Sequence, residues 1–250
     1  SRSDYPNQLD PALVFPGIFR GLLDARARNI NMAILDGAAR ALAAAVPAER
    51  LHADHIVPPI FDFRVAPAIA AAVFTQNLVQ AAPVVVSRAH LRHRTHRAII
   101  VNSGCANAVT GAEGEANATA TTELVASLLQ CQPREVLVCS TGVIGVQLDM
   151  NKLSAGIQTA APALTRQSGT AIAQLSSAIM TTDTRPKLVT RTAQIGDRQV
   201  RCTGIAKGAG MIHPNMATML SAIVTDAFVA QPVLQAALLA AADVSFNRIS

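Results

Sequence analysis

Aromatic residues are nearly absent from this chain. They make up 3% of its 250 residues, with one tyrosine and no tryptophan. A hydrophobic core must therefore consist of alanine, valine, leucine and isoleucine, which favours helices and buried strands. Domains that bind nucleic acid usually stack bases on aromatic side chains or present a long basic stripe. Neither feature is present, so we do not expect nucleic acid as a partner.

An excess of charge is also lacking, because the formal net charge is only +5. The densest basic segment is RAHLRHRTHR over residues 88–97, where histidines and arginines alternate. Without interleaved aromatic residues, this segment is typical of a solvated loop.

The four cysteines lack the spacing of a metal site. Zinc-binding cysteines usually occur in CxxC pairs or with histidines a few residues away. Cys105, Cys131, Cys139 and Cys202 follow neither pattern. We expect no bound metal, and free thiols in a reducing compartment.

Long apolar segments are missing as well. The chain does not start with a charged segment followed by an apolar one, as a secretory signal does. The longest Ala/Leu-rich run, residues 233–244, contains Gln235 and Asp243 and is too short to span a bilayer. We expect a cytoplasmic protein without a membrane partner.

The hydrophobic periodicity predicts a mixture of helices and strands. Helices are expected at 31–46, 115–129, 152–163, 170–178 and 232–243. Strands are expected at 82–87, 98–102, 135–140 and 219–224, with a hairpin formed by 188–194 and 199–203. The fold class is therefore α/β, of the α+β type with mixed layers.

The stretch KGAGMIHPNMATML, residues 207–220, is the most informative part of the sequence. Its glycines and proline allow tight backbone geometry before Ala217 and Thr218. A threonine hydroxyl is a weak nucleophile, but an N-terminal threonine can pass its proton to its own α-amine. The stretch is either a self-cleavage site between Ala217 and Thr218 or a buried loop-to-strand junction that contains a threonine.

Four other motifs precede this stretch in the chain. They are VFTQNLVQAAP at 73–83, VNSGCANAVTG at 101–111, CSTGVIG at 139–145 and MTTDTRPK at 180–187. In this order, the five motifs resemble the ornithine acetyltransferase family, the glutamate N-acetyltransferases of arginine biosynthesis. One departure is Cys105, where the family more often has asparagine.

The resemblance implies an autoprocessed acyltransferase that needs no cofactor. The precursor would cleave itself between Ala217 and Thr218, and the freed Thr218 would carry an acetyl group from N-acetylornithine to glutamate. Thr141 and Gly142 would form the oxyanion hole. On residue types alone, Ser-Thr-Gly is an ordinary turn.

The resemblance also implies which residues contact the substrate. Either Thr181 or Thr182 matches a substrate-contacting threonine, and the loop length leaves the choice open. Lys207 would bind a substrate carboxylate, although a lysine before a glycine-rich turn is usually solvated. Processed chains of a complete enzyme would form homo-oligomers.

The first part of the chain has a different character. The motifs RSDYPNQ at 2–8, FPGIFRGLLDAR at 15–26, HIVPPIFD at 55–62 and RVAPA at 64–68 resemble the C-terminal end of malic enzymes. The glycine-rich nucleotide fingerprint, metal carboxylates and Tyr/Lys pair of those enzymes have no counterpart here. We expect a mainly helical malic-enzyme-like fragment over 1–72, a seam within 66–73, and an incomplete ornithine-acetyltransferase-like domain, truncated at both ends, over 73–250.

Three functions remain open at this point. The chain is an N-acetyltransferase, an inactive chimera or fragment, or a malic-enzyme-type oxidoreductase remnant that uses NAD(P). Whether it is an enzyme at all therefore depends on experiment.

Self-cleavage separates the first of these from the others. If the geometry of the precursor survives truncation, the parent chain should split before Thr218, and the Thr218→Ala variant should remain a single chain because the nucleophilic hydroxyl is gone. Intact mass and gel electrophoresis measure both. Unchanged cleavage in Thr218→Ala would show that Thr218 is not the nucleophile.

Overall fold

The structure, a computed structural model, describes residues 70–93, 95–164, 168–196, 198–210, 212 and 219–249. These residues lie in one compact unit, Ile69–Ser250. The helix expected at 31–46 and almost all of the malic-enzyme-like segment lie outside the described residues. Ala217 and Thr218 lie outside them too.

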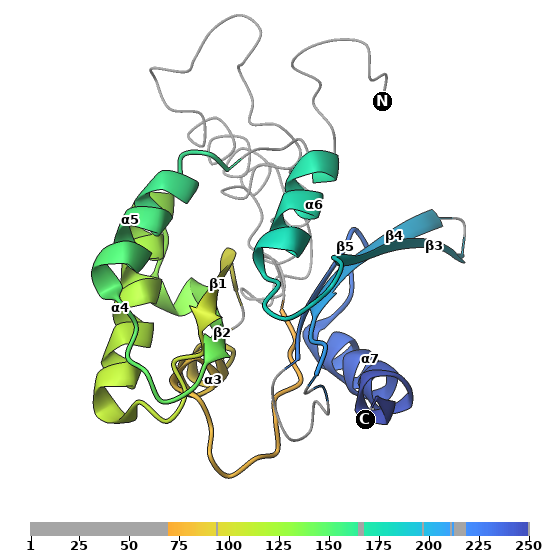
Figure 1. Cartoon of the computed structure of the whole chain (residues 1–250). Coiled ribbons are helices and arrows are strands. Elements are labelled where there is room, and N and C mark those ends of the chain that lie inside the picture. The colour runs from red at the N-terminus through yellow and green to blue at the C-terminus, as the bar shows by residue number, and fades with distance from the viewer. Residues whose placement is uncertain are drawn as a thin grey trace, which may run out of the picture. The chain divides into compact units, whose positions relative to one another are not determined.

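A parallel pair of strands forms the first part of a mixed α/β fold (Figure 1). Strand β1, Ala98–Cys105, pairs in parallel with β2, Val136–Val143, and helix α4, Gly111–Leu129, connects them. A parallel pair needs such a crossover. Both strands and the helix confirm the sequence-based predictions.

The second part is a three-stranded antiparallel sheet in the order β3-β4-β5. Strands β3, Lys187–Ile195, and β4, Arg198–Lys207, form the expected hairpin, and β5, Leu220–Thr225, pairs with the other edge of β4. Three further predicted helices are also confirmed: α5, Met150–Ala160; α6, Ser168–Ala178; and α7, Gln231–Val244. Single 3-10 turns occur at Pro133–Glu135 and Phe246–Arg248.

The strand expected at 82–87 is wrong, because this segment is part of helix α3, Ala82–His90. Three consecutive valines suggested a strand, since β-branched residues favour strands. However, Ala82, Pro83, Val86 and Ser87 are buried together, which is the spacing of one helical face. Pro83 lies in the first turn, where a proline is tolerated because no intrahelical N–H is required.

The core lies between the parallel pair and its helices. Apart from Pro83, the apolar side chains that are buried in the described part of the chain are alanine, valine, leucine and isoleucine, as the composition predicts. One cluster joins α3, α4 and β2 through Val86, Ala118 and Val138. A second joins α4, β2 and α5 through Val125, Val136 and Ile157. Strand β2 is therefore the centre of this core.

The basic segment over residues 88–97 is solvated only in part, because Arg92 and His93 are exposed but other members are not. His96 is 4% exposed, and burial lowers its pKa. Arg97 forms an ion pair with Glu135 at 3.5 Å, and its backbone N–H donates to the Glu135 carbonyl. His90 Nδ1 donates to the Val136 carbonyl at 2.8 Å. These contacts fix the start of β1 against the start of β2.

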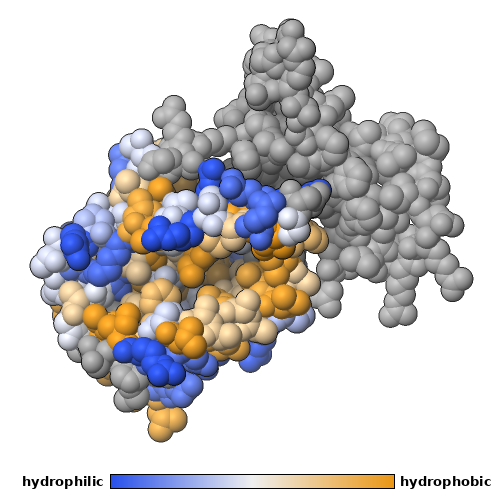
Figure 2. Space-filling model, turned by 90° about the vertical axis from the view of Figure 1, so that its right-hand side faces the viewer, coloured by the Kyte–Doolittle hydropathy of each residue, from blue (hydrophilic) through white to orange (hydrophobic). Residues whose placement is uncertain are grey.

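The three-stranded sheet is more exposed than the parallel pair. Val189 on β3 and Ile223 on β5 are exposed apolar residues of this sheet. Figure 2 shows apolar patches interspersed with polar side chains on one face of the described part. None of the helices that the structure describes combines the length and apolar character needed to cross a membrane.

The contact of Ser87 with β2 predicts a measurable stability effect. The Ser87 hydroxyl donates to the Val138 carbonyl at 2.7 Å and accepts from the Val138 N–H at 2.8 Å, and all three groups are buried. Ser87→Ala leaves both backbone groups without these partners, so we expect it to lower the free energy of unfolding by at least about 2 kcal/mol. Urea denaturation measures this. The matched variant Ser127→Ala, on the exposed side of α4, should change it by less than about 0.5 kcal/mol.

Candidate active site

The carboxyl ends of β1 and β2 form the first half of the candidate site. Ser103 pairs with Thr141, and Gly104 pairs with Gly142, so the two strand ends are level. Cys105 pairs with both Val143 and Thr141, which marks a bulge at the last pair. Bulges often lie next to active sites because they free or redirect backbone groups. In open α/β sheets, ligands bind at this end of the strands.

Gly142 allows the two strand ends to approach closely. Its φ of +133° is unfavourable for residues with a side chain, and a Cβ here would overlap the carbonyl group of Gly104. Beyond the strands, the Ala106 N–H donates to the Val143 carbonyl at 2.8 Å, and the Gly145 N–H donates to the Ala108 carbonyl at 2.9 Å. The loops that follow β1 and β2 are thus hydrogen-bonded to each other.

The asparagine of the GCANAVTG segment fixes the first of these loops. Asn107 is completely buried, donates to the Gly114 carbonyl and accepts from the Thr110 hydroxyl. Its φ is +47°, a conformation that asparagine tolerates better than most residues. Its amide therefore holds the β1 loop against the start of α4.

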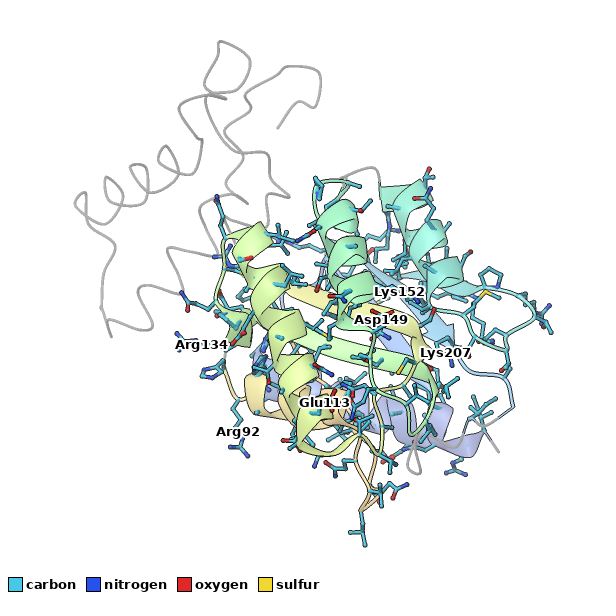
Figure 3. All side chains as sticks on the ribbon, turned by 60° about the vertical axis from the view of Figure 1, so that its left-hand side comes forward. Arg92, Glu113, Arg134, Asp149, Lys152 and Lys207 are labelled. Atoms are coloured by element: carbon cyan, nitrogen blue, oxygen red, sulfur yellow. The ribbon has the colours of Figure 1, made fainter. Side chains whose placement is uncertain are left out.

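A hydrogen bond from Lys207 to Thr141 joins the two sheets. Lys207 Nζ, at the end of β4, donates to Thr141 Oγ1 at 3.0 Å. Lys207 is 5% exposed and Thr141 is 7% exposed. Figure 3 labels Lys207, which the sequence suggested would be solvated on residue type alone. The structure instead brings together two of the predicted site residues, from segments 66 residues apart.

Asp183 is a site residue that the sequence analysis missed. Its side chain is 0% exposed, and Oδ1 forms an ion pair with Lys187 and accepts from the Gly208 N–H at 2.8 Å. Its other oxygen accepts from the Thr181 N–H at 3.3 Å. The MTTDTRPK motif contained the signal, since a carboxylate between two threonines and a lysine has donors nearby on both sides.

The two candidate threonines of this motif are placed differently from Thr141. Both Thr181 and Thr182 are exposed, and the backbone of Thr181 is bound to Asp183. Ala217 and Thr218 lie outside the described residues, but Leu220 begins β5 and pairs with Lys207. The described site thus contains Thr141, Gly142, Lys207 and Asp183, with Thr181 and Thr182 at its edge.

Burial and neighbouring groups shift the pKa values of both Lys207 and Asp183. Burial lowers the pKa of Lys207, with a smaller contribution from the Lys187 charge, and the Asp183 charge opposes this. For Asp183, burial alone would raise the pKa, but the hydrogen bonds from Lys187, Gly208 and Thr181 outweigh it and lower the pKa to about 2. Asp183 is therefore a carboxylate at any ordinary pH.

The site is suited to hydrogen bonding rather than to metal ligation. In the described ranges, no three His, Cys, Asp or Glu side chains are grouped as metal ligands would be. The site instead presents a hydroxyl, an ammonium and the backbone of two strand ends. Such groups bind carboxylates and stabilise oxyanions.

A sequence profile of the ArgJ family matches residues 61–250. The chain belongs to the ArgJ family. The profile of the malic enzyme NAD-binding domain matches residues 1–78, in agreement with the two resemblances seen in the sequence. The two matches overlap over 61–78, which includes the expected seam at 66–73.

Curated ArgJ proteins are similar to most of the chain. The Arginine biosynthesis bifunctional protein ArgJ of Lactococcus lactis is 50% identical over 184 residues, which are 74% of this chain and 45% of that protein. The protein of the same name from Geobacter sulfurreducens is 50% identical over 186 residues, 74% of this chain and 46% of that protein. The chain thus spans less than half the length of these relatives.

Two solved structures resemble the fold. The ArgJ protein of Bacillus halodurans has a TM-score of 0.56 and 37% identity, covering 62% of this chain and 78% of that one. The ornithine acetyltransferase of Mycobacterium tuberculosis, solved with ornithine, has a TM-score of 0.50 and 37% identity, covering 62% and 80%. The mixed α/β architecture is therefore that of ArgJ structures.

The low pKa of Asp183 predicts an acid-dependent loss of stability. The folded chain holds this carboxylate charged down to a pH of about 2, whereas an unfolded aspartate has a pKa of about 3.9. The contribution of this carboxylate to the free energy of unfolding is therefore complete above about pH 4, and it is lost as the pH falls toward about 2. Asp183→Asn should be less stable than the parent at neutral pH, and the difference should shrink through this window.

Urea denaturation at a series of pH values measures this difference. Asp243→Asn, at an exposed position of α7, is the control for the loss of a surface carboxylate. A difference for Asp183→Asn that is the same at neutral pH and at the acid end of the window would contradict the prediction.

Proposed function

We propose that this chain carries the catalytic scaffold of an acyltransferase that moves an acetyl group from N-acetylornithine to glutamate through Thr218. The observation that carries this proposal is the hydrogen bond from Lys207 to Thr141 at the glycine-lined end of β2. It combines a cation, a hydroxyl and backbone groups at one buried point. These are the groups that acyl transfer between amino acids requires.

The contact with Lys207 orients the Thr141 hydroxyl for catalysis. A hydroxyl has one proton to donate and two lone pairs that accept. Because Lys207 Nζ occupies one lone pair, the proton of Thr141 must point elsewhere, and it is available to a developing oxyanion. The adjacent Gly142 would add its backbone N–H, in the role that the resemblance implied.

The covalent chain tethers the proposed nucleophile to this site. Thr218 precedes Leu220 by two residues, and two peptide units span at most about 7 Å. Leu220 pairs with Lys207, and Lys207 contacts Thr141. This supports a role for Thr218 within reach of the Thr141 hydroxyl.

The proposed reaction balances without a cofactor. Thr218 Oγ attacks the acetyl carbon of N-acetylornithine, its proton passes through the α-amine to the leaving nitrogen, and the amide C–N bond breaks. Ornithine leaves, and the acetyl group remains as an ester on Thr218. The amine of glutamate then attacks the ester, which forms N-acetylglutamate and restores the hydroxyl.

Lys207 and the exposed threonines would bind the substrate. An ammonium that is buried beside a hydroxyl suits the α-carboxylate that ornithine and glutamate share. Either Thr181 or Thr182 would contact the rest of the substrate from the edge of the site. In support, the M. tuberculosis relative was solved as a complex with ornithine.

We further propose that the chain consists of two pieces, 1–72 and 73–250. The overlapping profile matches support a seam in this region. Processed chains would then assemble as homo-oligomers, and the first piece would contribute no oxidoreductase activity.

Removing one oxyanion donor tests the function. Thr141→Val keeps the shape of the side chain but loses the hydroxyl, and we expect acetyl transfer to fall by about 10²–10³-fold. Transfer from N-acetylornithine to glutamate is followed by mass spectrometry on the full chain. The control is Thr190→Val, at an exposed position of β3, which should retain parental activity.

Other outcomes separate the alternatives. Equal transfer by the parent and Thr141→Val would contradict the oxyanion role. If the parent chain shows no cleavage and no acetyl transfer, the result would favour the inactive chimera. Reduction of a nicotinamide cofactor with malate would favour the oxidoreductase.

A further inference from the structure

The carboxylate of Asp183 lies where two segments of the candidate site meet. It accepts the backbone N–H of Thr181, two residues before it, and the backbone N–H of Gly208, 25 residues after it. The first donor belongs to the segment of the exposed threonines, and the second directly follows Lys207. No part of the proposed reaction uses this carboxylate.

We propose that Asp183 is the positioning residue of this site: it fixes the Lys207–Gly208 turn to the Thr181–Thr182 segment and supplies the negative charge that the buried Lys207 ammonium requires. The role of that ammonium as a substrate contact rests on the proposed function. The electrostatic link between Asp183 and Lys207 is independent of the proposed function.

A counter-charge is needed because Lys207 is almost completely buried. A charge taken out of water is costly unless an opposite charge or several hydrogen bonds compensate for it. The Thr141 hydroxyl, which accepts from Nζ, is neutral. Asp183 is bound to the residue next to Lys207, and its charge acts on the ammonium.

Lys187 provides the opposing influence. It forms the direct ion pair with Asp183, and its own positive charge acts against that of Lys207. The charged groups that act on Lys207 in the described site are thus one carboxylate and one ammonium, of opposite effect. A variant of each should shift the titration of Lys207 in opposite directions.

The sequence makes this measurable, because it contains only three lysines: Lys152, Lys187 and Lys207. A full chain labelled with [13Cε]lysine gives three signals, which lysine-to-methionine variants assign. Lys152, at the exposed start of α5 (Figure 3), is an internal control. Titration to about pH 11 covers the ordinary lysine pKa of about 10.4.

We expect Lys207 to titrate below the ordinary lysine range in the parent chain, because the ammonium is buried. In Asp183→Asn, the midpoint of Lys207 should fall by about one pH unit or more, because the opposite charge is removed. In Lys187→Met, which keeps Asp183, it should rise. The midpoint of Lys152 should be the same in all three proteins.

Opposite shifts distinguish an electrostatic role from a purely structural one. A loosened fold would move Lys207 toward the midpoint of an exposed lysine in both variants. A folded Asp183→Asn with an unchanged Lys207 midpoint would overturn the proposal. If Asp183→Asn does not fold, a failure of Lys187→Met to raise the midpoint would overturn it.

The titration needs no catalysis, so it fails separately from the proposed function. Opposite shifts without acetyl transfer would support the role of Asp183 and contradict the transferase. Acetyl transfer together with an unchanged Lys207 midpoint would support the transferase and contradict the role of Asp183.

Discussion

The hydrogen bond between Lys207 and Thr141 is the contact on which the candidate site depends. It connects the end of the antiparallel sheet to the end of the parallel pair, across 66 residues. A second contact supports it on the neighbouring strand, where the Ser103 hydroxyl donates to the Ala178 carbonyl at the end of α6. Ser103 and Thr141 face each other in the β1–β2 pairing, so the two strand ends reach the second half of the fold together. These contacts bring together predicted site residues that lie on separate strands.

Local sequence patterns were sufficient for most of the elements but not for the centre of the site. Helix α4 was predictable because its buried residues recur with helical spacing, and the β3–β4 hairpin because two alternating segments flank a turn. The error at α3 arose because β-branched residues were weighed above the spacing of Ala82, Val86 and Ser87. The segment around His90 was misjudged for a related reason, since His90 contacts the Val136 carbonyl, 46 residues away along the chain.

The roles proposed for Thr141 and Lys207 rest on the family resemblance, whereas the role proposed for Asp183 required the fold. A lysine before a glycine-rich turn is usually solvated, and only the distance to Thr141 shows that this one is not. Asp183 binds Gly208 through a contact that no periodicity predicts, because hydrogen bonds between loops follow from tertiary packing. Two of the three lysines in the chain interact with this single carboxylate, so the site concentrates a residue type that is otherwise scarce.

The absence of a side chain at Gly142 has an evolutionary consequence. Since its Cβ would occupy the space of the Gly104 carbonyl, position 142 cannot drift, and the backbones at 104 and 142 cannot be remodelled one at a time. The exposed segments around the strand ends, such as that of Thr181 and Thr182, do not share this restriction. The close approach of the two glycines would therefore restrict evolutionary change of the backbone at the strand ends, while the exposed segments around them can change with less disturbance.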